Sequence, residues 1–154
     1  MLALSTDLLL EALAEVLQTM AFISPEPSTG DAPAPADAVC LSLRWTGVCA
    51  GEIRLAAPRQ LGELLAVNIL AVEPGTPEAG RRALDALQEL CNITAGTLLA
   101  RLCDASQDAP EMSLPQVTPL PDAAAWSQFV AQPETLVLLA EGLPLAIRLQ
   151  ESPA

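Results

Sequence analysis

Histidine, lysine and tyrosine are absent from this chain of 154 residues, and its seven basic residues are all arginines. These absences exclude Ser-His-Asp and Cys-His catalysis, Schiff-base chemistry on lysine, and the lysine of a P-loop. Any catalytic group of the chain must therefore be a carboxylate, an amide, a hydroxyl or a thiol. We expect an enzyme with so few reactive side chains to complete a site that its partner already holds.

Long hydrophobic runs are also missing. No segment approaches the roughly 18 apolar residues of a membrane-spanning helix. The chain starts with Asp7, Glu11 and Glu15 and has no early basic residue, unlike a signal peptide. Because 51% of the residues are hydrophobic, the composition argues against disorder. The sequence therefore predicts one domain over residues 1–154 and a cytoplasmic location.

Positive charge is scarce as well, and the formal net charge is −12. Nucleic-acid binding is therefore not expected, because too few cationic groups are available to displace phosphate counterions. The negative charge favours a partner with a basic rim. It is equally consistent with an acidic surface that only keeps a hydrophobic chain in solution.

The sequence predicts no metal site and no cofactor of the chain's own. Its cysteines lack C-x-x-C spacing and have no histidine to complete a zinc set, so we expect reduced thiols in the core. They are Cys40, Cys49, Cys91 and Cys103. Asp104, Asp108 and Glu111 have the chemistry of a magnesium site, but acidic loops of this kind are common and we expect no metal there.

Hydrophobic periodicity predicts an α+β fold with helices packed on an antiparallel sheet. The expected helices cover residues 6–23, 58–72, 77–103 and 122–131, and the expected strands cover 39–45, 48–55, 112–118, 135–140 and 145–150. A proline-rich loop over 24–38 and an acidic loop over 104–111 interrupt them. Thr76 is a good candidate for the N-cap of the third helix.

The helix expected over 77–103 has a distinct polar face. Asp85, Glu89, Asn92 and Gly96 fall within roughly 40° of one line along a helix of 100° per residue. The opposite face carries Leu87, Leu90, Thr94 and Leu98. A helix anchored by its leucines would therefore present two carboxylates and a carboxamide outward. The glycine at the end of the row would let another surface approach closely.

This spacing resembles a known signature. Asp85-x3-Glu89-x2-Asn92, followed by Gly96 and later by Ser113-Leu-Pro115, looks like the motif of the CheC/CheX/FliY family of response-regulator phosphatases from bacterial chemotaxis. The single clear copy is most similar to the single-site CheX type. The resemblance implies a CheX/CheC-like α+β fold with an internal pseudo-repeat, and homodimers, although an acidic chain could equally stay monomeric.

The resemblance also implies a reaction, the hydrolysis of the aspartyl phosphate on a CheY-like receiver domain in chemotaxis or another two-component pathway. Glu89 would form a salt bridge with the active-site lysine of the receiver. Asn92 would enter the receiver site and orient the attacking water, as a carboxamide can both donate to and accept from water. Asp85 would be a supporting or rim contact. The Mg²⁺ would belong to the receiver.

Two further patterns suggest the pseudo-repeat. Glu11-x3-Glu15-x2-Gln18 in the first helix has the spacing of the motif, so it could be a degenerate second copy or ordinary helix surface. Glu-Ile-Arg-Leu at 52–55 is echoed by Ala-Ile-Arg-Leu at 146–149.

Other functions remain open at this point. The chain could be a non-catalytic CheX-like adaptor that docks a receiver without hydrolysing anything, or a structural component of the flagellar switch. The intact pair of Glu89 and Asn92 favours the phosphatase, since an adaptor does not require both.

Overall fold

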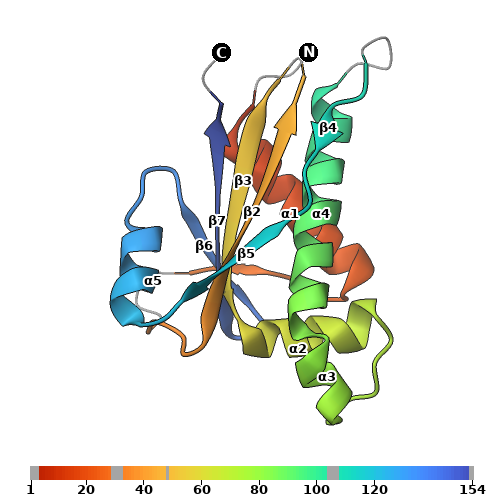
Figure 1. The fold of residues 1–154 in the computed structure, drawn as a ribbon, viewed down its shortest axis with the longest axis vertical. Coiled ribbons are helices and arrows are strands. Elements are labelled where there is room, and N and C mark those ends of the chain that lie inside the picture. The colour runs from red at the N-terminus through yellow and green to blue at the C-terminus, as the bar shows by residue number, and fades with distance from the viewer. Residues whose placement is uncertain (1–3, 29–32, 48, 104–107, 153–154) are drawn as a thin grey trace.

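The computed structural model describes residues 4–28, 33–47, 49–103 and 108–152. Within them the chain forms an α+β fold (Figure 1). The helices are α1 (Thr6–Met20), α2 (Arg59–Ile69), α3 (Pro77–Arg81), α4 (Ala83–Leu102) and α5 (Ala123–Val130). The strands are β1 (Glu26–Pro27), β2 (Ala38–Thr46), β3 (Gly51–Pro58), β4 (Glu111–Met112), β5 (Gln116–Leu120), β6 (Leu136–Ala140) and β7 (Leu143–Glu151).

All strand pairs of the sheet are antiparallel, in the order β1-β6-β7-β3-β2-β4, and β5 also pairs with β2. The C-terminal hairpin, β6 and β7, thus lies next to β3 in the middle of the sheet. In this register Arg54 stands directly opposite Arg148, so the two echoed segments of the sequence are neighbouring strands. Such pairing is compatible with a pseudo-repeat, which stays a prediction.

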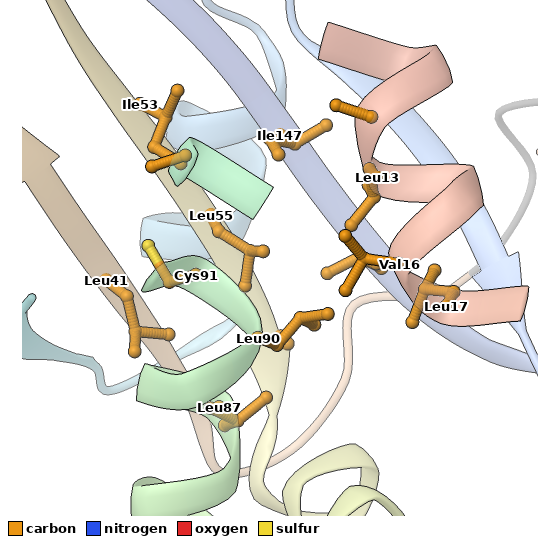
Figure 2. Close-up of a cluster of buried hydrophobic side chains, with 14 of the residues drawn as sticks. Leu13, Val16, Leu17, Leu41, Ile53, Leu55, Leu87, Leu90, Cys91 and Ile147 are labelled. Carbon is orange, nitrogen blue, oxygen red and sulfur yellow. The ribbon is translucent and has the colours of Figure 1, made fainter. Parts of the chain in front are cut away.

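The main core lies between one face of the sheet and helices α1, α2 and α4. Alternate residues of the strands point into this core. Helix α4, which carries Asp85, Glu89 and Asn92, contributes its leucines to it (Figure 2). The residues labelled there are Leu13, Val16, Leu17, Leu41, Ile53, Leu55, Leu87, Leu90, Cys91 and Ile147. Burial of these side chains, each worth about 1.5–3 kcal/mol for a large aliphatic residue, holds α4 firmly on the sheet.

Helix α5 lies on the other side of the sheet from α4 (Figure 1). Trp126 and Phe129 of this helix pack there on a smaller cluster with Ala38, Ala56 and Ala146. The helix expected over 122–131 is therefore present, and these two aromatic residues anchor it. Asp122 caps the helix by accepting a hydrogen bond from the N–H of Ala125 at 2.8 Å.

The expected helix over 77–103 is interrupted. Arg82 has φ −96° and ψ 3°, and this non-helical residue divides the segment into α3 and α4. Gly80, whose helix propensity is about 1 kcal/mol below that of alanine, lies two residues before the break. Thr76 occupies the N-cap position of α3, but its hydroxyl donates to the carbonyl of Glu73 instead of capping the helix.

The other boundaries differ by a few residues. The loop over 24–38 contains the short edge strand β1, which pairs with β6, and the strand expected over 48–55 lies at Gly51–Pro58. The strand expected over 112–118 is divided into β4 and β5. Residues 29–32, 48 and 104–107 lie outside the described part of the chain. Within the described ranges, none of the helices has the length and apolar character needed to cross a membrane.

Two glycines allow close packing. A Cβ at Gly62 would lie 2.4 Å from the carbonyl oxygen of Ala83, so this glycine lets α2 cross the start of α4. A Cβ at Gly51 would lie 2.6 Å from the ring of Trp45, its partner across the β2–β3 ladder. The pairing of Gly51 with Trp45 is regular, so this glycine makes room for the tryptophan ring.

Candidate functional site

The polar face of α4 is exposed and its apolar face is buried. Asp85 and Glu89 are exposed, while Asn92 and Gly96 are partly exposed. Leu87, Leu90, Thr94 and Leu98 are completely buried on the opposite face. The sequence therefore placed both faces correctly. Asn92 lies at the middle of α4, where helical hydrogen bonds on both sides hold the backbone and a fixed side-chain direction is easiest to maintain.

The second part of the motif, Ser113-Leu-Pro115, lies beside this face. It joins β4 to β5, both of which pair with β2, and forms a bulge at the sheet edge. The N–H of Ser113 donates to the carbonyl of Arg44 at 2.8 Å, and the N–H of Arg44 donates to the hydroxyl of Ser113 at 3.0 Å. This side-chain bond replaces a backbone bond of the ladder. The next two residues can therefore leave the edge of the sheet.

The bulge reaches α4 at Gln88, whose amide is within 3.4 Å of the carbonyl oxygen of Pro115. Leu114 projects into solvent with 85% of its surface exposed. Between the helix and the bulge is a hollow of about 430 Å³, lined by Asp85, Gln88, Glu89, Asn92, Leu114 and Pro115. The fold thus brings together motif residues that are more than twenty positions apart in the sequence.

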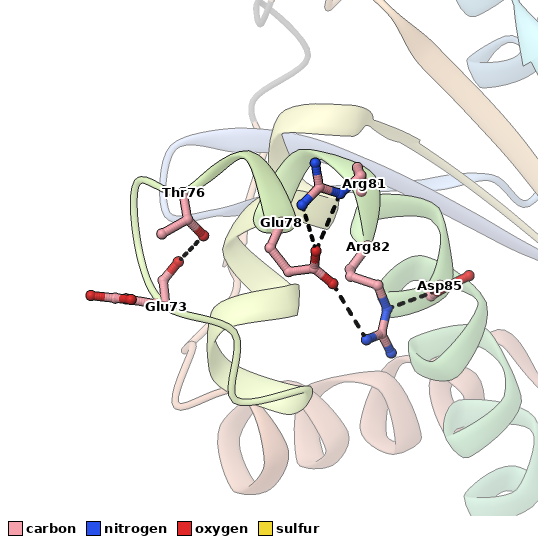
Figure 3. A network of polar contacts seen from close by, with 6 residues as sticks. All are labelled: Glu73, Thr76, Glu78, Arg81, Arg82 and Asp85. Atoms are coloured by element: carbon pink, nitrogen blue, oxygen red, sulfur yellow. Dashed lines mark hydrogen bonds and ion pairs between the residues drawn. The ribbon is translucent and has the colours of Figure 1, made fainter.

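Asp85 already has a partner. Its carboxylate accepts from Nε of Arg82 at 2.9 Å, and a second nitrogen of Arg82 lies 3.8 Å from Glu78 (Figure 3). Arg81 pairs with the same glutamate at 2.8 Å. The non-helical residue that separates α3 from α4 therefore fixes the first carboxylate of the motif.

Glu89 and Asn92 differ from Asp85 in this respect. Within the described ranges, neither side chain makes a hydrogen bond or an ion pair with the rest of the chain. Both line the hollow. A carboxylate and a carboxamide that protrude from a rigid helix and make no internal bonds are available to a second molecule.

The similar spacing in α1 has a different environment. Glu11 and Glu15 both pair with Arg101 of α4, at 3.3 Å for Glu11. These contacts tie α1 to α4 across the surface of the molecule. The two carboxylates are therefore engaged within the chain, unlike Glu89, and the interpretation as ordinary helix surface accounts for them.

Metal ligands are not grouped in the described part of the chain: no set of three or more His, Cys, Asp or Glu residues there could hold an ion. Asp104, one member of the acidic trio considered above, lies outside the described residues. None of the four cysteines forms a disulfide, and burial raises the pKa of Cys91 to about 12. Such a thiol is protonated at neutral pH and chemically inert.

The sequence-based interpretation missed two members of this surface. Gln88 lies three residues after Asp85 and four before Asn92, so the helical spacing that selected the others could also have selected it. Arg82 lies three residues before Asp85, so the same helical spacing could have selected it as well. The break in the helix at Arg82 is the feature that was not expected, because the segment was predicted to be one continuous helix.

Known proteins were compared with the chain at the level of sequence and of structure. No protein-family model matches the sequence, and no curated protein matches it. Among solved structures, the chemotaxis protein CheX from Vibrio vulnificus is similar, with a TM-score of 0.66, 17% identity and 95% of each chain covered.

Two further solved structures are similar to this chain. A CheC-like protein from a Shewanella species has a TM-score of 0.63 and 18% identity over 96% of each chain. CheX from Borrelia burgdorferi, in a complex with CheY, BeF₃ and Mg²⁺, has a TM-score of 0.62 and 15% identity over 96% of this chain and 97% of that one. The chain therefore has the fold of CheX and CheC-like proteins, and the resemblance predicted from the sequence is confirmed at the level of fold.

Proposed function

We propose that this protein is a phosphatase that hydrolyses the aspartyl phosphate of a CheY-like receiver domain in chemotaxis or a related two-component pathway. One observation carries the proposal. Glu89 and Asn92 protrude from the middle of a helix whose other face is completely buried, and neither has a partner within the described chain. The similarity to a CheX that forms a complex with CheY supports the same partner.

Each side chain has a role that fits its chemistry. The carboxylate of Glu89 would pair with the active-site lysine of the receiver and thereby align α4 with the phosphorylated aspartate. The carboxamide of Asn92 would enter the receiver site, where it would accept a hydrogen bond from the attacking water and hold it in line with the bond to be broken. A carboxylate at this position would repel the phosphoryl oxygens.

The remaining residues of the surface would support docking. Asp85, held by Arg82, would form the rim of the contact, and Gly96 would let the receiver approach the helix backbone closely. The chain would contribute no metal and no nucleophile, because the receiver would hold the Mg²⁺ and the attacking group would be water. The mechanism is therefore mainly one of positioning.

The test is to mix the purified protein with a phosphorylated CheY-like receiver of the same organism and Mg²⁺, and to time the loss of phosphate. We expect wild type to accelerate the loss. Asn92→Ala should still bind the receiver but lose most of the acceleration, since a side chain that only positions water adds little to affinity. Glu89→Ala should weaken binding as well as turnover.

Gln18→Ala provides the matched control, because Gln18 has the place of Asn92 in the spacing of α1. This variant should keep full activity. Binding without acceleration by wild type would instead indicate a non-catalytic adaptor. Equal activity of wild type and Asn92→Ala would contradict the role given to the carboxamide.

We also propose that the protein is cytoplasmic and forms a homodimer, as expected from its resemblance to CheX. Light scattering on the eluting peak of a gel-filtration column measures the mass directly. A mass close to the 16.1 kDa of one chain would overturn the dimer.

A further inference from the structure

The sheet face turned away from α4 concentrates positive charge. Strand residues on this face alternate with those of the core, and they include Arg44 on β2, Arg54 on β3 and Arg148 on β7. We call these three residues the arginine face. Three of the seven arginines of a chain with net charge −12 thus lie on one side of the sheet.

The register places two of these arginines side by side. Arg54 is directly opposite Arg148, Ser42 is opposite Arg54, and Gln116 is opposite Ser42. Four adjacent strands therefore present one row of hydrogen-bond donors, and neighbouring members are about 5 Å apart. Like charges directly opposite in a sheet are destabilising when nothing lies between them.

A hollow of about 690 Å³ opens above this row. Its floor is the arginine face with Ser42 and Gln116, and its wall is formed by Gln128 and Phe129 of α5 and by Gln132 just after that helix. Its lining residues include no aspartate and no glutamate, although the chain has 19 acidic residues. A volume of this size fits a small molecule.

The charge within the hollow is only partly balanced. Glu52, almost buried at its edge, pairs with Arg54 at 2.9 Å and with Arg44 at 3.4 Å. Arg148 has no carboxylate partner within the described part of the chain. One carboxylate therefore faces three guanidinium groups.

The position of Arg148 is fixed by α5. One of its nitrogens donates to the carbonyl of Phe129 at 3.0 Å, and its guanidinium carbon lies 4.2 Å from the centre of the Phe129 ring. Burial and the neighbouring Arg54 lower the pKa of Arg148 from its ordinary value. An anion in the hollow would favour the charged form of Arg148 and so offset both effects. A guanidinium held in place also loses little side-chain entropy on binding.

We propose that this hollow is a binding site for a small molecule that carries a phosphate group. A phosphate between Arg54 and Arg148 would accept hydrogen bonds from both guanidinium groups and from Ser42 or Gln116, and would separate the two like charges. A guanidinium group can pair with two oxygens at once, and a phosphate group has more oxygens to share between two guanidinium groups than a single carboxylate has, which favours phosphate. The site lies on the opposite side of the sheet from Asn92 and is independent of the proposed reaction.

Isothermal titration calorimetry at constant ionic strength tests the site. Pyrophosphate and ribose 5-phosphate are the probes, and succinate is the dicarboxylate comparison. We expect one equivalent of either probe to bind wild type more tightly than succinate. Arg148→Gln and Arg54→Gln should each weaken binding at least about tenfold, because each removes charge-assisted hydrogen bonds.

Two variants serve as controls. Arg81→Gln removes an exposed guanidinium of α3, and Asn92→Ala changes the other side of the sheet; both should bind the probes as wild type does. In case an arginine variant fails to fold, amide NMR shifts of wild type on titration should change at Ser42, Gln116 and Arg148. No binding, equal binding of succinate, or unchanged affinity in both arginine variants would overturn the proposal.

Discussion

Thr94 lies completely buried in the middle of α4, and its hydroxyl has no hydrogen-bond partner among the described residues. A buried polar group without a partner keeps its desolvation cost, so Thr94→Val should raise the free energy of unfolding by about 1 kcal/mol. Urea denaturation measures the change. Thr94→Ser keeps the hydroxyl, loses a methyl group and should be less stable than wild type. A valine variant no more stable than wild type would contradict the assignment.

Cys91 should make stability depend on pH in the alkaline range. Burial, and then the neighbouring Cys40, raise its pKa to about 12, while a thiol in the unfolded chain titrates near ~8.5. Between about pH 9 and 12 the unfolded state therefore binds fewer protons than the folded state. The free energy of unfolding should fall with pH by up to about 1.4 kcal/mol per unit.

The composition simplifies the interpretation of this slope, because the chain has no lysine or tyrosine side chain to titrate in the same pH range. Unfolding by urea at several alkaline pH values gives the slope. Cys91→Ala should be less stable overall but should lose stability less steeply as pH rises. An identical slope in both proteins would show that other thiols are responsible.

At the residue scale, helical periodicity was sufficient to predict that the polar face of the candidate site is exposed. The exposure of Asp85, Glu89 and Asn92 follows from leucines on the opposite face, because a long helix on a sheet can bury only one side. The ion pair of Asp85 with Arg82 has the i,i+3 spacing of neighbours on a helix and could have been predicted too, but the break in the helix at Arg82 did not follow from periodicity. The approach of Pro115 to Gln88 did not follow either, because it depends on tertiary structure.

At the element scale, Gly96 weakens a helix for no reason visible within the chain. A Cβ there would meet nothing within 4 Å, so Gly96→Ala should stabilise the protein by up to about 1 kcal/mol in thermal or urea unfolding. If a receiver packs closely on this face, as proposed, Gly96→Gln should retain the fold and lose most of the activity on the phosphorylated receiver.

Ala124→Gln is the matched control for that experiment, since Ala124 is exposed on α5, far from the hollow beside α4. It should be as active as wild type. A fully active Gly96→Gln variant would indicate that the glycine has no part in docking.

Elements with strong local signals were predictable, and interrupted ones were not. The alternation in β2 and the hairpin of β6 and β7 correspond to regular structure that the residues themselves encode. The bulge at Ser113 depends on hydrogen bonds with Arg44, which is distant in the sequence, and the break at Arg82 falls inside a segment with helical periodicity. Propensity averaged along the sequence does not resolve them.

At the scale of the whole molecule, the α+β class was predictable and the order of the strands was not. A strand pattern states which face is apolar but does not state which strands are neighbours. The placement of β7 beside β3 is the clearest case, because it brings Arg148 next to Arg54 from the other end of the chain. The basic hollow therefore has no counterpart in the sequence, where the same arginines are scattered.

The two sides of the sheet also differ in the position of their tryptophans. Trp45, only 1% exposed, lies in the main core, and Trp126, 5% exposed, is a residue of α5 that packs on the opposite face of the sheet. Since the chain has no tyrosine, its intrinsic fluorescence comes essentially from these two indoles. Replacing either tryptophan by phenylalanine leaves a protein whose fluorescence reports on one side of the sheet. Thermal unfolding of the two variants, followed by fluorescence, therefore shows which side of the sheet unfolds first without an added label.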